Sequence, residues 1–342
     1  MGKIKLLDIS NKKECEKWEE FVLNNGYMYQ SVRWIYALKS YKFQPYYLYF
    51  EKNGKIDSVL PLFHVKFFPF LNELVSIPHC EAGGFINPQY YELFFDYIAK
   101  NFNVKNVKIY QFNSEIDDFP KNDLNKIFLL NLPETIDGIY KLFKKRFKRS
   151  IENILKKTDV NVYSGNDDNF IKILYDLNVV KNKEFGTPHH SFNFISSFVK
   201  AFGSKSKIFV AKKNNIPIGA SFIIHFGKIV YHIFHFIPKK YLKEKVGLIL
   251  FFYMFQYCLE KNIKIFCLGR SPENSGTFKF KKETGAEIYP LNLYNFKIKN
   301  SKLVAEKPKI LQEKYQWAAD IWSKLPSPIT NFLSPIIRKW VY

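Results

Sequence analysis

The chain has few cysteines, and their spacing suggests neither a disulfide framework nor a metal site. Its 342 residues include four, at positions 15, 80, 258 and 267, and no two of them form a C-x-x-C pair. Cys258 and Cys267 lie in apolar runs, where a thiol behaves as a small hydrophobic group. We therefore expect a reducing compartment and no bound metal.

Long hydrophobic runs are also absent. The longest one, residues 246–259, is interrupted by Gln256 and is shorter than the roughly 18 to 20 residues that a membrane span requires. The opening MGKIKLLDIS has no hydrophobic signal segment, and Leu6 breaks the myristoylation pattern. We expect a buried helix at 246–259 and a cytoplasmic protein.

Acidic residues are scarce beside basic ones. The 31 Asp and Glu face 52 Lys and Arg, which gives a formal net charge of +21 and favours anionic partners. The alternative is that lysine coats a solvated surface as part of a wider compositional bias, which the 18% aromatic content would share. With 47% hydrophobic and 24% charged residues the chain can bury a sizeable core, which excludes wholesale disorder.

Strand and helix patterns are mixed in the first part of the chain. Two strand patterns, 46–51 and 56–65, flank Asn53-Gly54, a dipeptide that supplies the positive φ angles of a tight hairpin turn. Helices are expected at 15–24, 31–41 and 90–101, and strands at 74–77, 107–112 and 127–132, the last after a polar connecting segment at 113–126. This mixture predicts an α/β or α+β unit.

The second part begins with a helical apolar stripe over 139–155 whose other face is basic and includes Arg146 and Arg149. Further helices are expected at 169–183, 192–202 and 248–261, with strands at 207–212, 218–226, 229–237 and 264–268. Both parts place hairpin strands before a helix and a further strand. Two related α/β domains would explain this order.

A polar loop follows the last of these strands, in the segment LGRSPENSGTFKFKKETGA at 268–286. It combines a fixed cation, Arg270, with Lys279 and with hydroxyls and backbone amides at Ser271, Ser275 and Gly276. Such a loop suits a phosphate or a carboxylate. The alternative is a strand-to-helix turn in which Arg270 caps neighbouring carbonyls.

This segment, with Pro290-Leu291, resembles the signature of FemAB-like proteins of the GNAT acyltransferase superfamily, especially the subgroup associated with exosortase and exopolysaccharide loci. The resemblance extends to GKIDSVLPLFHVKFFPFLNELVSIPHCEAGGF, KKRFKRSIENILKK and KEFGTPHHSFNF, in order, over about residues 18–293. It implies an α/β fold with mixed sheets and two tandem GNAT-like domains, at 1–133 and 134–300. The segment 301–342 would pack back on the first domain.

The resemblance also implies transfer of an acyl or aminoacyl group onto an amine of a cell-envelope precursor or sugar. The donor would be acyl-CoA or aminoacyl-tRNA, with no tightly bound cofactor. A donor pyrophosphate would meet the start of the helix at Gly247, beside Lys243 and Lys245. The usual glycine loop is reduced to KEKVG here, which leaves aminoacyl-tRNA open, with Arg146 and Arg149 against its phosphates.

Candidate acid–base residues come from two loops. His79 and Glu81, beside Gly83-Gly84, would shape an acceptor pocket, with Glu81 as the general base. Thr187 and His189 lie in a loop that matches the family, with His189 as a second catalytic candidate. The alternatives are a solvated acid and a turn that ends a helix. His232 and His235 alternate with apolar residues and are interpreted as packing residues.

The main rival to an enzyme is a catalytically silent protein that holds an envelope polysaccharide, a lipid-linked precursor or RNA. Peripheral contact with the inner face of the membrane is a further expectation, from the aromatic and basic tail PSPITNFLSPIIRKWVY. Three prolines in this tail, Pro326, Pro328 and Pro335, argue against one continuous amphipathic helix.

Overall fold

The computed structural model describes all residues except 1, 68, 143–151, 153–158, 308–315 and 342. It divides into two compact units. The first unit is Met1–Ile127 with Arg270–Glu273 and Tyr289–Ile310, and the second unit is Phe128–Gly269 with Asn274–Ile288 and Leu311–Tyr342. Three strands contribute residues to both units: β6 (Lys121–Asn131), β11 (Ile265–Pro272) and β12 (Glu287–Lys299). The predicted domain bounds, 1–133, 134–300 and 301–342, remain a prediction.

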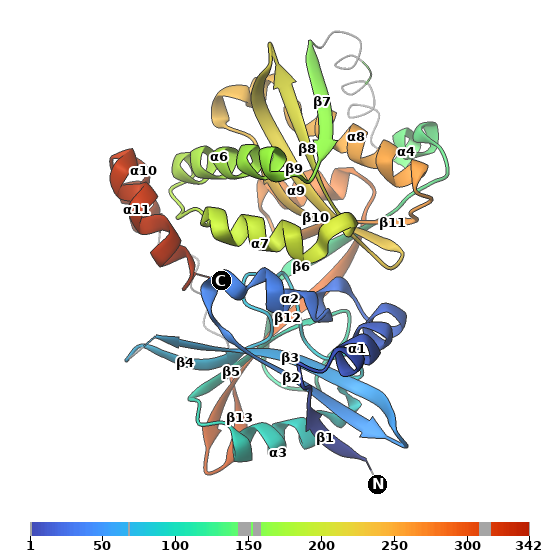
Figure 1. Ribbon diagram of the computed structural model, residues 1–342, viewed down its shortest axis with the longest axis vertical. Helices are drawn as coiled ribbons and strands as arrows, with labels where there is room; N and C mark the ends of the chain where they lie inside the picture. Colours follow the sequence, from blue (N-terminus) through green and yellow to red (C-terminus); the bar gives the residue numbers. More distant parts are fainter. Residues whose placement is uncertain (1, 68, 143–151, 153–158, 308–315, 342) are drawn as a thin grey trace. The chain divides into compact units, whose positions relative to one another are not determined.

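The first unit is a mixed sheet with helices (Figure 1). Its strands run in the order β1-β2-β3-β4-β5-β12, and β13 pairs with β12. They are β1 (Lys3–Leu6), β2 (Gln44–Lys52), β3 (Lys55–Phe67), β4 (Leu71–Val75), β5 (Asn106–Phe112) and β13 (Lys302–Glu306). The helices are α1 (Lys12–Asn25), α2 (Arg33–Ala37) and α3 (Tyr91–Asn101), with short 3-10 turns η1 (Met28–Gln30), η2 (Lys39–Tyr41) and η3 (Pro88–Tyr90).

Alternating side chains of this sheet fill two separate cores. One face of β2 and β3 presents Leu48 and Leu60, which join Phe94 and Ile98 of α3 in an apolar cluster. The opposite face presents Tyr47, whose ring lies 5.0 Å from that of Trp18 on α1. Side chains of a strand alternate between its faces, so both faces of the sheet are covered by helices.

The second unit has the strand order β11-β10-β9-β8-β7. Its strands are β7 (Val160–Gly165), β8 (Ser206–Lys213), β9 (Ile216–Phe226) and β10 (Ile229–Phe236). Its helices are α4 (Ile136–Leu142), α6 (Asp168–Glu184), α7 (Phe192–Phe202), α8 (Val246–Glu260), α9 (Gly276–Glu283), α10 (Gln316–Lys324) and α11 (Ser327–Arg338), with 3-10 turns η4 (Gly203–Lys205) and η5 (Lys239–Glu244).

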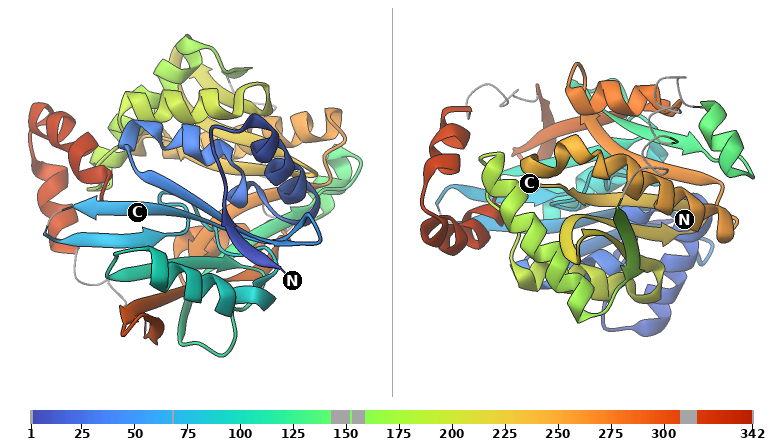
Figure 2. Two further views of the ribbon diagram at one scale, coloured as in Figure 1. Left: turned by 60° about the horizontal axis from the view of Figure 1, so that its bottom comes forward. Right: turned by 90° about the horizontal axis from the view of Figure 1, so that it is seen from above.

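Helices cover both faces of this sheet as well (Figure 2). Phe209 of β8 packs in the cluster that contains Met254 of α8, and Phe222 of β9 contacts Phe198 of α7 with ring centroids 5.7 Å apart. As expected for residues 246–259, α8 is a buried apolar helix. Among the described residues no helix is long and apolar enough to cross a membrane.

The two units repeat one order of elements, as the sequence predicts. In each, an antiparallel meander leads to a helix that is followed by a strand parallel to the last strand of the meander. In the first unit β4 pairs with β5 over Glu73–Val75 and Asn106–Lys108, around α3. In the second unit β10 pairs with β11 over Ile229–Tyr231 and Ile265–Cys267, around α8. Both parallel pairings stop after three positions.

Two local predictions were wrong, and the strands β1, β7, β12 and β13 were not predicted. Strand β6 begins at Lys121, so residues 121–126 of the expected connecting segment at 113–126 are strand. The tail contains one helix, α11, despite its prolines. Pro326 and Pro328 lie at its start, where a backbone N–H has no helical partner to lose, and only Pro335 lies inside it.

Candidate functional site

In the first unit, the loop after β4 is fastened to β5. The backbone N–H groups of Gly83 and Gly84 both donate to the carbonyl of Tyr110, at 3.1 and 2.9 Å. The Gln111 amide accepts from the N–H of Phe85 at 2.7 Å and donates to its carbonyl at 3.0 Å. A Cβ at position 84 would lie 2.1 Å from Oε1 of Gln111, so only glycine allows this contact. The loop thereby covers the gap beyond the short β4–β5 pairing.

Glu81 is held in this loop by two hydrogen bonds. Its Oε1 accepts from the backbone N–H of Arg270 at 2.8 Å, and its Oε2 accepts from the hydroxyl of Tyr29 at 3.1 Å. Tyr29 is buried and Glu81 is half-buried. The structure therefore brings together Glu81 and Arg270, which are 189 positions apart in the chain. Glu81 fixes the main chain from which the exposed Arg270 side chain projects.

His79 and Ser271, also in the first unit, are less accessible than expected. The His79 ring stacks on Phe43 with centroids 6.3 Å apart and lies 4.8 Å from the ring of Tyr41. Ser271 is 1% exposed, and its hydroxyl has no hydrogen-bond partner among the described residues. Both side chains are therefore less exposed to solvent than Arg270.

The rest of the signature segment forms the start of α9 in the second unit. Ser275 caps this helix, because its hydroxyl accepts from the N–H of Phe278 at 3.1 Å. The Ser275 oxygen also lies 3.0 Å from the Thr277 hydroxyl. Gly276 and Lys279 are exposed on the first turns, and a Cβ at Gly276 would meet nothing within 4 Å. The hydroxyl of Ser275 is therefore used to cap the helix, whereas the surface around Gly276 is accessible to solvent.

In the second unit, polar side chains lie on β10 immediately after its pairing with β11 ends. A β-bulge lies between His232 and Phe234 of β10, immediately after the pairing with β11 ends. The Nδ1 of His235 lies 2.7 Å from the hydroxyl of Ser221, and the rings of His232 and His235 have centroids 5.1 Å apart. The Nε2 of His232 is buried with no hydrogen-bond partner among the described residues. This group of residues, with Lys181, is called the histidine cluster below.

Lys181 of α6 extends into this cluster. Its ammonium donates to the carbonyl of His235 and lies 5.7 Å from the ring centroid of Phe185 and 5.8 Å from that of Phe236. Burial lowers the pKa of Lys181. Nothing in the sequence indicates this role, because a lysine near the end of a helix is usually solvated.

Both histidines of the cluster are neutral at pH 7. Burial lowers the pKa of His232 well below its usual range, with a further contribution from His235. Burial, followed by the charges of Lys181 and Lys281, lowers the pKa of His235 to about 3. Packing, which the sequence favoured, explains the contacts of His232 with Phe251 and Phe266. It does not explain the Ser221–His235 hydrogen bond.

The start of α8 lies beside His235. A Cβ at Gly247 would be 3.1 Å from the Nε2 of His235, so this glycine keeps the first turn of α8 close to the imidazole. Lys245, at φ 53°, precedes the helix, and both Lys243 and Lys245 are exposed. Free backbone amides at a helix start attract anions, and two lysines add positive charge. The residues present therefore suit a phosphate group.

Thr187 and His189 have structural contacts in the second unit. The Thr187 hydroxyl donates to Oδ1 of Asn182 at 3.0 Å, which closes the end of α6. His189 is 2% exposed, its Nδ1 lies 2.9 Å from the carbonyl of His190, and its ring packs edge-on to Tyr175. Burial lowers its pKa. The predicted phosphate contacts Arg146 and Arg149 lie outside the described residues.

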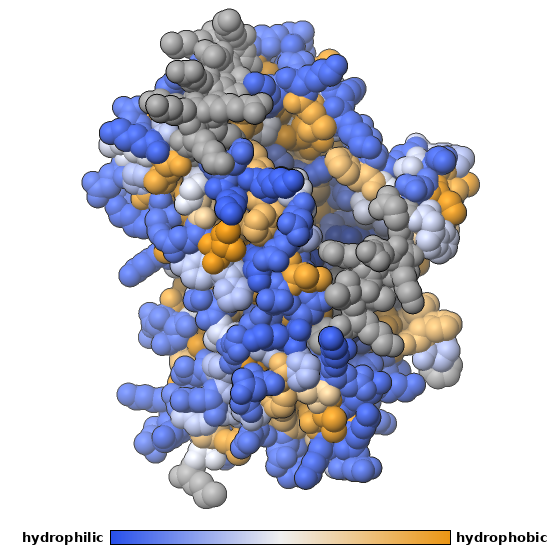
Figure 3. Space-filling model, turned by 180° about the vertical axis from the view of Figure 1, so that it is seen from behind, coloured by the Kyte–Doolittle hydropathy of each residue, from blue (hydrophilic) through white to orange (hydrophobic). Residues whose placement is uncertain are grey.

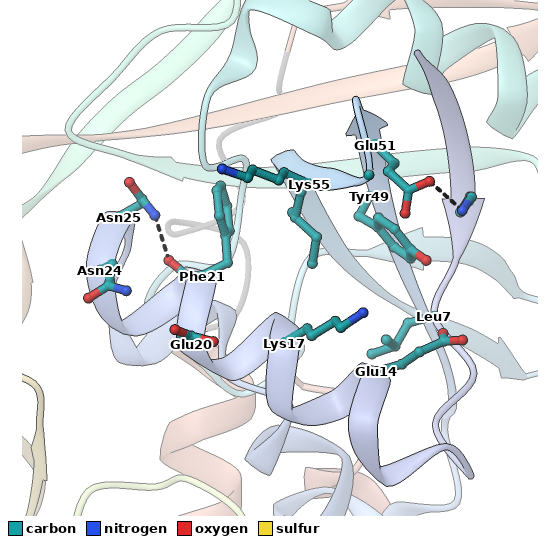
Figure 4. A pocket seen from close by; sticks show the side chains of 13 residues that line it. Leu7, Glu14, Lys17, Glu20, Phe21, Asn24, Asn25, Tyr49, Glu51 and Lys55 are labelled. Carbon is teal, nitrogen blue, oxygen red and sulfur yellow. Dashed lines mark hydrogen bonds and ion pairs between the residues drawn. The ribbon is translucent and has the colours of Figure 1, made fainter. Parts of the chain in front are cut away.

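A hollow of about 540 Å³ lies between α1 and the β2–β3 hairpin of the first unit (Figure 4). Charged residues of both signs line it, including Lys17 and Glu20 of α1, and Lys5 and Glu51 form an ion pair at its edge, 2.5 Å apart. It contains none of the predicted site residues. Opposite charges already neutralise one another there, so the hollow has no evident ligand.

A comparison with models of known protein families identifies one domain in the second part of the chain. Residues 141–282 match the family model of the acetyltransferase (GNAT) domain. No protein of curated function matches the chain. The matched range contains the histidine cluster, the start of α8 and most of the signature segment.

Solved structures resemble nearly the whole chain. FemX has 12% sequence identity and a TM-score of 0.65, and the match covers 89% of this chain and 98% of FemX. A tandem GNAT protein from the clavulanic acid biosynthesis pathway has 8% identity and a TM-score of 0.55, covering 87% and 99%. The C-terminal domain of a putative lysylphosphatidylglycerol synthetase from Agrobacterium fabrum has 11% identity and a TM-score of 0.55, covering 90% and 94%.

These likenesses concern the fold. The predicted fold class, mixed α/β with two tandem GNAT-like domains, is confirmed. The FemAB-like resemblance is supported at the level of the fold. The chain thus has the architecture of acyltransferases, whereas the exosortase and exopolysaccharide subgroup stays a prediction.

Proposed function

We propose that the protein transfers an acyl or aminoacyl group from an anionic carrier to an amine on a cell-envelope precursor or sugar. The observation that carries this proposal is the difference between the two units just beyond their parallel pairings. Gly83, Gly84 and Gln111 join the loop of the first unit to β5, while the second unit places neutral imidazoles on β10 beside a helix start. The donor would therefore bind to the second unit.

The chemistry requires an unprotonated amine that attacks the acyl carbon while the carrier's sulfur or oxygen leaves with a proton. A neutral imidazole can hydrogen-bond to a reacting group, and a nearby ammonium can stabilise the oxyanion of the tetrahedral intermediate. We assign these roles to His235 and Lys181; with a pKa of about 3, His235 is too weakly basic to be the general base. Glu81, the general base that the sequence suggests, is assigned here as a positioning residue for Arg270, because its two oxygens already accept hydrogen bonds from Tyr29 and Arg270.

The carrier is acyl-CoA or aminoacyl-tRNA. Both present phosphate groups, which Lys243, Lys245 and the backbone amides of Val246 and Gly247 at the start of α8 would bind, and Arg270 would contact an anionic part of donor or acceptor. Arg270 is exposed, so its side chain is accessible to a ligand. Mass spectrometry of material that copurifies with the protein distinguishes CoA, tRNA and a lipid-linked sugar.

A binding experiment tests the donor site directly. Gly247→Val places a branched side chain against His235 and should weaken CoA binding at least about tenfold, as loss of one charge-assisted contact or more would do. Gly54→Val in the β2–β3 turn is the control, because a side chain there meets nothing within 4 Å and the turn contains no predicted binding residue. Equal CoA affinity in the two variants would contradict the assignment of the donor site.

The salt dependence of binding distinguishes the two carriers. If tRNA is the donor, the logarithm of its binding constant should fall with the logarithm of salt concentration by roughly 0.7 to 0.9 per neutralised phosphate. CoA carries few phosphates and should give a much smaller slope. Protein that binds neither carrier at low salt would favour the rival, a catalytically silent binding protein.

A further inference from the structure

The helix α11 has its apolar side in solvent and a polar side toward the protein. Ile329, Phe332 and Ile336 recur at helical spacing on one face and are 44%, 72% and 53% exposed. Thr330 and Ser334, on another face of the same helix, are 1% and 0% exposed. An ordinary surface helix has the opposite arrangement, so its exposed side is built for an apolar environment.

The neighbouring helix α10 also exposes large apolar side chains. Trp317 and Ile321, one turn apart, are 65% and 54% exposed. Leu325 and Pro326 join the two helices (Figure 1). The molecular face drawn in Figure 3 is mostly hydrophilic, with apolar residues in small groups. The helices α10 and α11 together expose five large apolar side chains. We call these five residues the C-terminal apolar face.

The charge around this face identifies what covers it. Within 316–341 the chain carries three cations, Lys324, Arg338 and Lys339, and one acid, Asp320. Lys183 of α6 adds a fourth cation, hydrogen-bonded to the Ser327 hydroxyl at the start of α11. Lys339 lies 4.5 Å from the ring centroid of Trp340. Tryptophan beside lysine, at the edge of an apolar helix face, is typical of helices that lie in the headgroup region of a bilayer.

We propose that α10 and α11 bind the surface of a bilayer that contains anionic lipids. The apolar face would enter the headgroup and acyl boundary, and the cations at its edge would contact lipid phosphates. Arg338 is held in place by a hydrogen bond from its Nε to the Nε2 of His190, 3.3 Å away. This surface is separate from the donor site and does not depend on the proposed reaction.

The test is flotation of the full chain with vesicles. Vesicles of phosphatidylcholine with phosphatidylglycerol should carry the protein upward, and vesicles of phosphatidylcholine alone should carry much less. The double variant Phe332→Ser, Ile336→Ser should lower partitioning at least about tenfold, since two apolar side chains are lost. Ile216→Ser removes an equally exposed apolar side chain from the β8–β9 hairpin and should have no effect.

A second variant tests the cations. Lys324→Gln with Lys339→Gln should weaken binding to anionic vesicles about fivefold per charge and leave the weak binding to neutral vesicles unchanged. The proposal is overturned if the Phe332→Ser, Ile336→Ser variant floats like the wild type, or if lipid charge has no effect. It is equally overturned if the wild type ignores vesicles and is a dimer that this variant dissociates, because a second copy then covers the face. Circular dichroism establishes that each variant is folded.

Discussion

Acid should destabilise the protein through the histidine cluster. The folded pKa of His235 is about 3, because burial and the charges of Lys181 and Lys281 oppose its protonation, whereas an unfolded histidine has a pKa near 6.5. A folded pKa below the unfolded value leaves stability unaffected above about pH 6.5. As pH falls from there towards 3, the unfolded chain binds a proton that the folded chain refuses, and stability is lost.

The magnitude for His235 follows from these two pKa values. Between pH 7 and pH 5 the free energy of unfolding should fall by about 2 kcal/mol from this group alone, out of roughly 5 to 15 kcal/mol for a typical protein. Urea unfolding of the wild type and of His235→Gln at both pH values measures it. The variant keeps an acceptor for the Ser221 hydroxyl and should lose about 2 kcal/mol less on acidification.

A surface histidine provides the control. His225, at the β9–β10 turn, lies 3.0 Å from the carbonyl of Gly227, and His225→Gln should keep the acid sensitivity of the wild type. His232 should add to the effect, since burial also lowers its pKa. If the wild type and His235→Gln lose the same stability between pH 7 and pH 5, the imidazole of His235 is not held neutral by its surroundings.

Two further predictions concern stability. Glu81→Gln should lower the free energy of unfolding by about 1.5 to 3 kcal/mol, because the carboxylate loses charge-assisted hydrogen bonds, and Tyr29→Phe, which removes one of them, should cost less; urea unfolding at neutral pH compares them. Gly186→Ala should destabilise strongly, because its Cβ would lie 2.2 Å from the carbonyl oxygen of Ala319 at a φ of 67°. Gly54→Ala, at a φ of 75° in open space, should cost only about 1 kcal/mol. A thermal melt in which the two alanine variants behave alike would contradict the close packing of Gly186.

Most elements could be predicted from the sequence because their signals are local. The Asn53-Gly54 turn has both residues at positive φ, and the turn between β8 and β9 has the same feature at Asn214 and Asn215. The strand β7 was not predicted because its pattern is weak and half of its residues face solvent. The prolines of α11 were misjudged because their cost depends on position in the helix, which is known only once the helix start is known.

The candidate site was harder to predict, because it depends on pairings far apart in the chain. Arg270 was expected to bind an anion from its local context, and it is exposed as that role requires. The Glu81–Arg270 hydrogen bond joins residues 189 positions apart, and nothing local to either residue indicates it. Lys181 and Ser221 meet His235 only because α6 and β9 pack on β10.

Because the two units repeat one order of elements, the segments that follow their parallel pairings can be compared directly. Both units end a parallel pairing after three positions, so each would hold an open gap unless something fills it. In the first unit two adjacent glycines let the loop reach Tyr110 and Gln111, and any side chain at Gly84 would prevent it. In the second unit the glycine stands instead at position 247, at the helix start, and the gap contains ionisable side chains that cost free energy to bury. A cluster of polar groups that is buried at such a cost supports a chemical role, and for this reason we propose that the donor binds to the second unit.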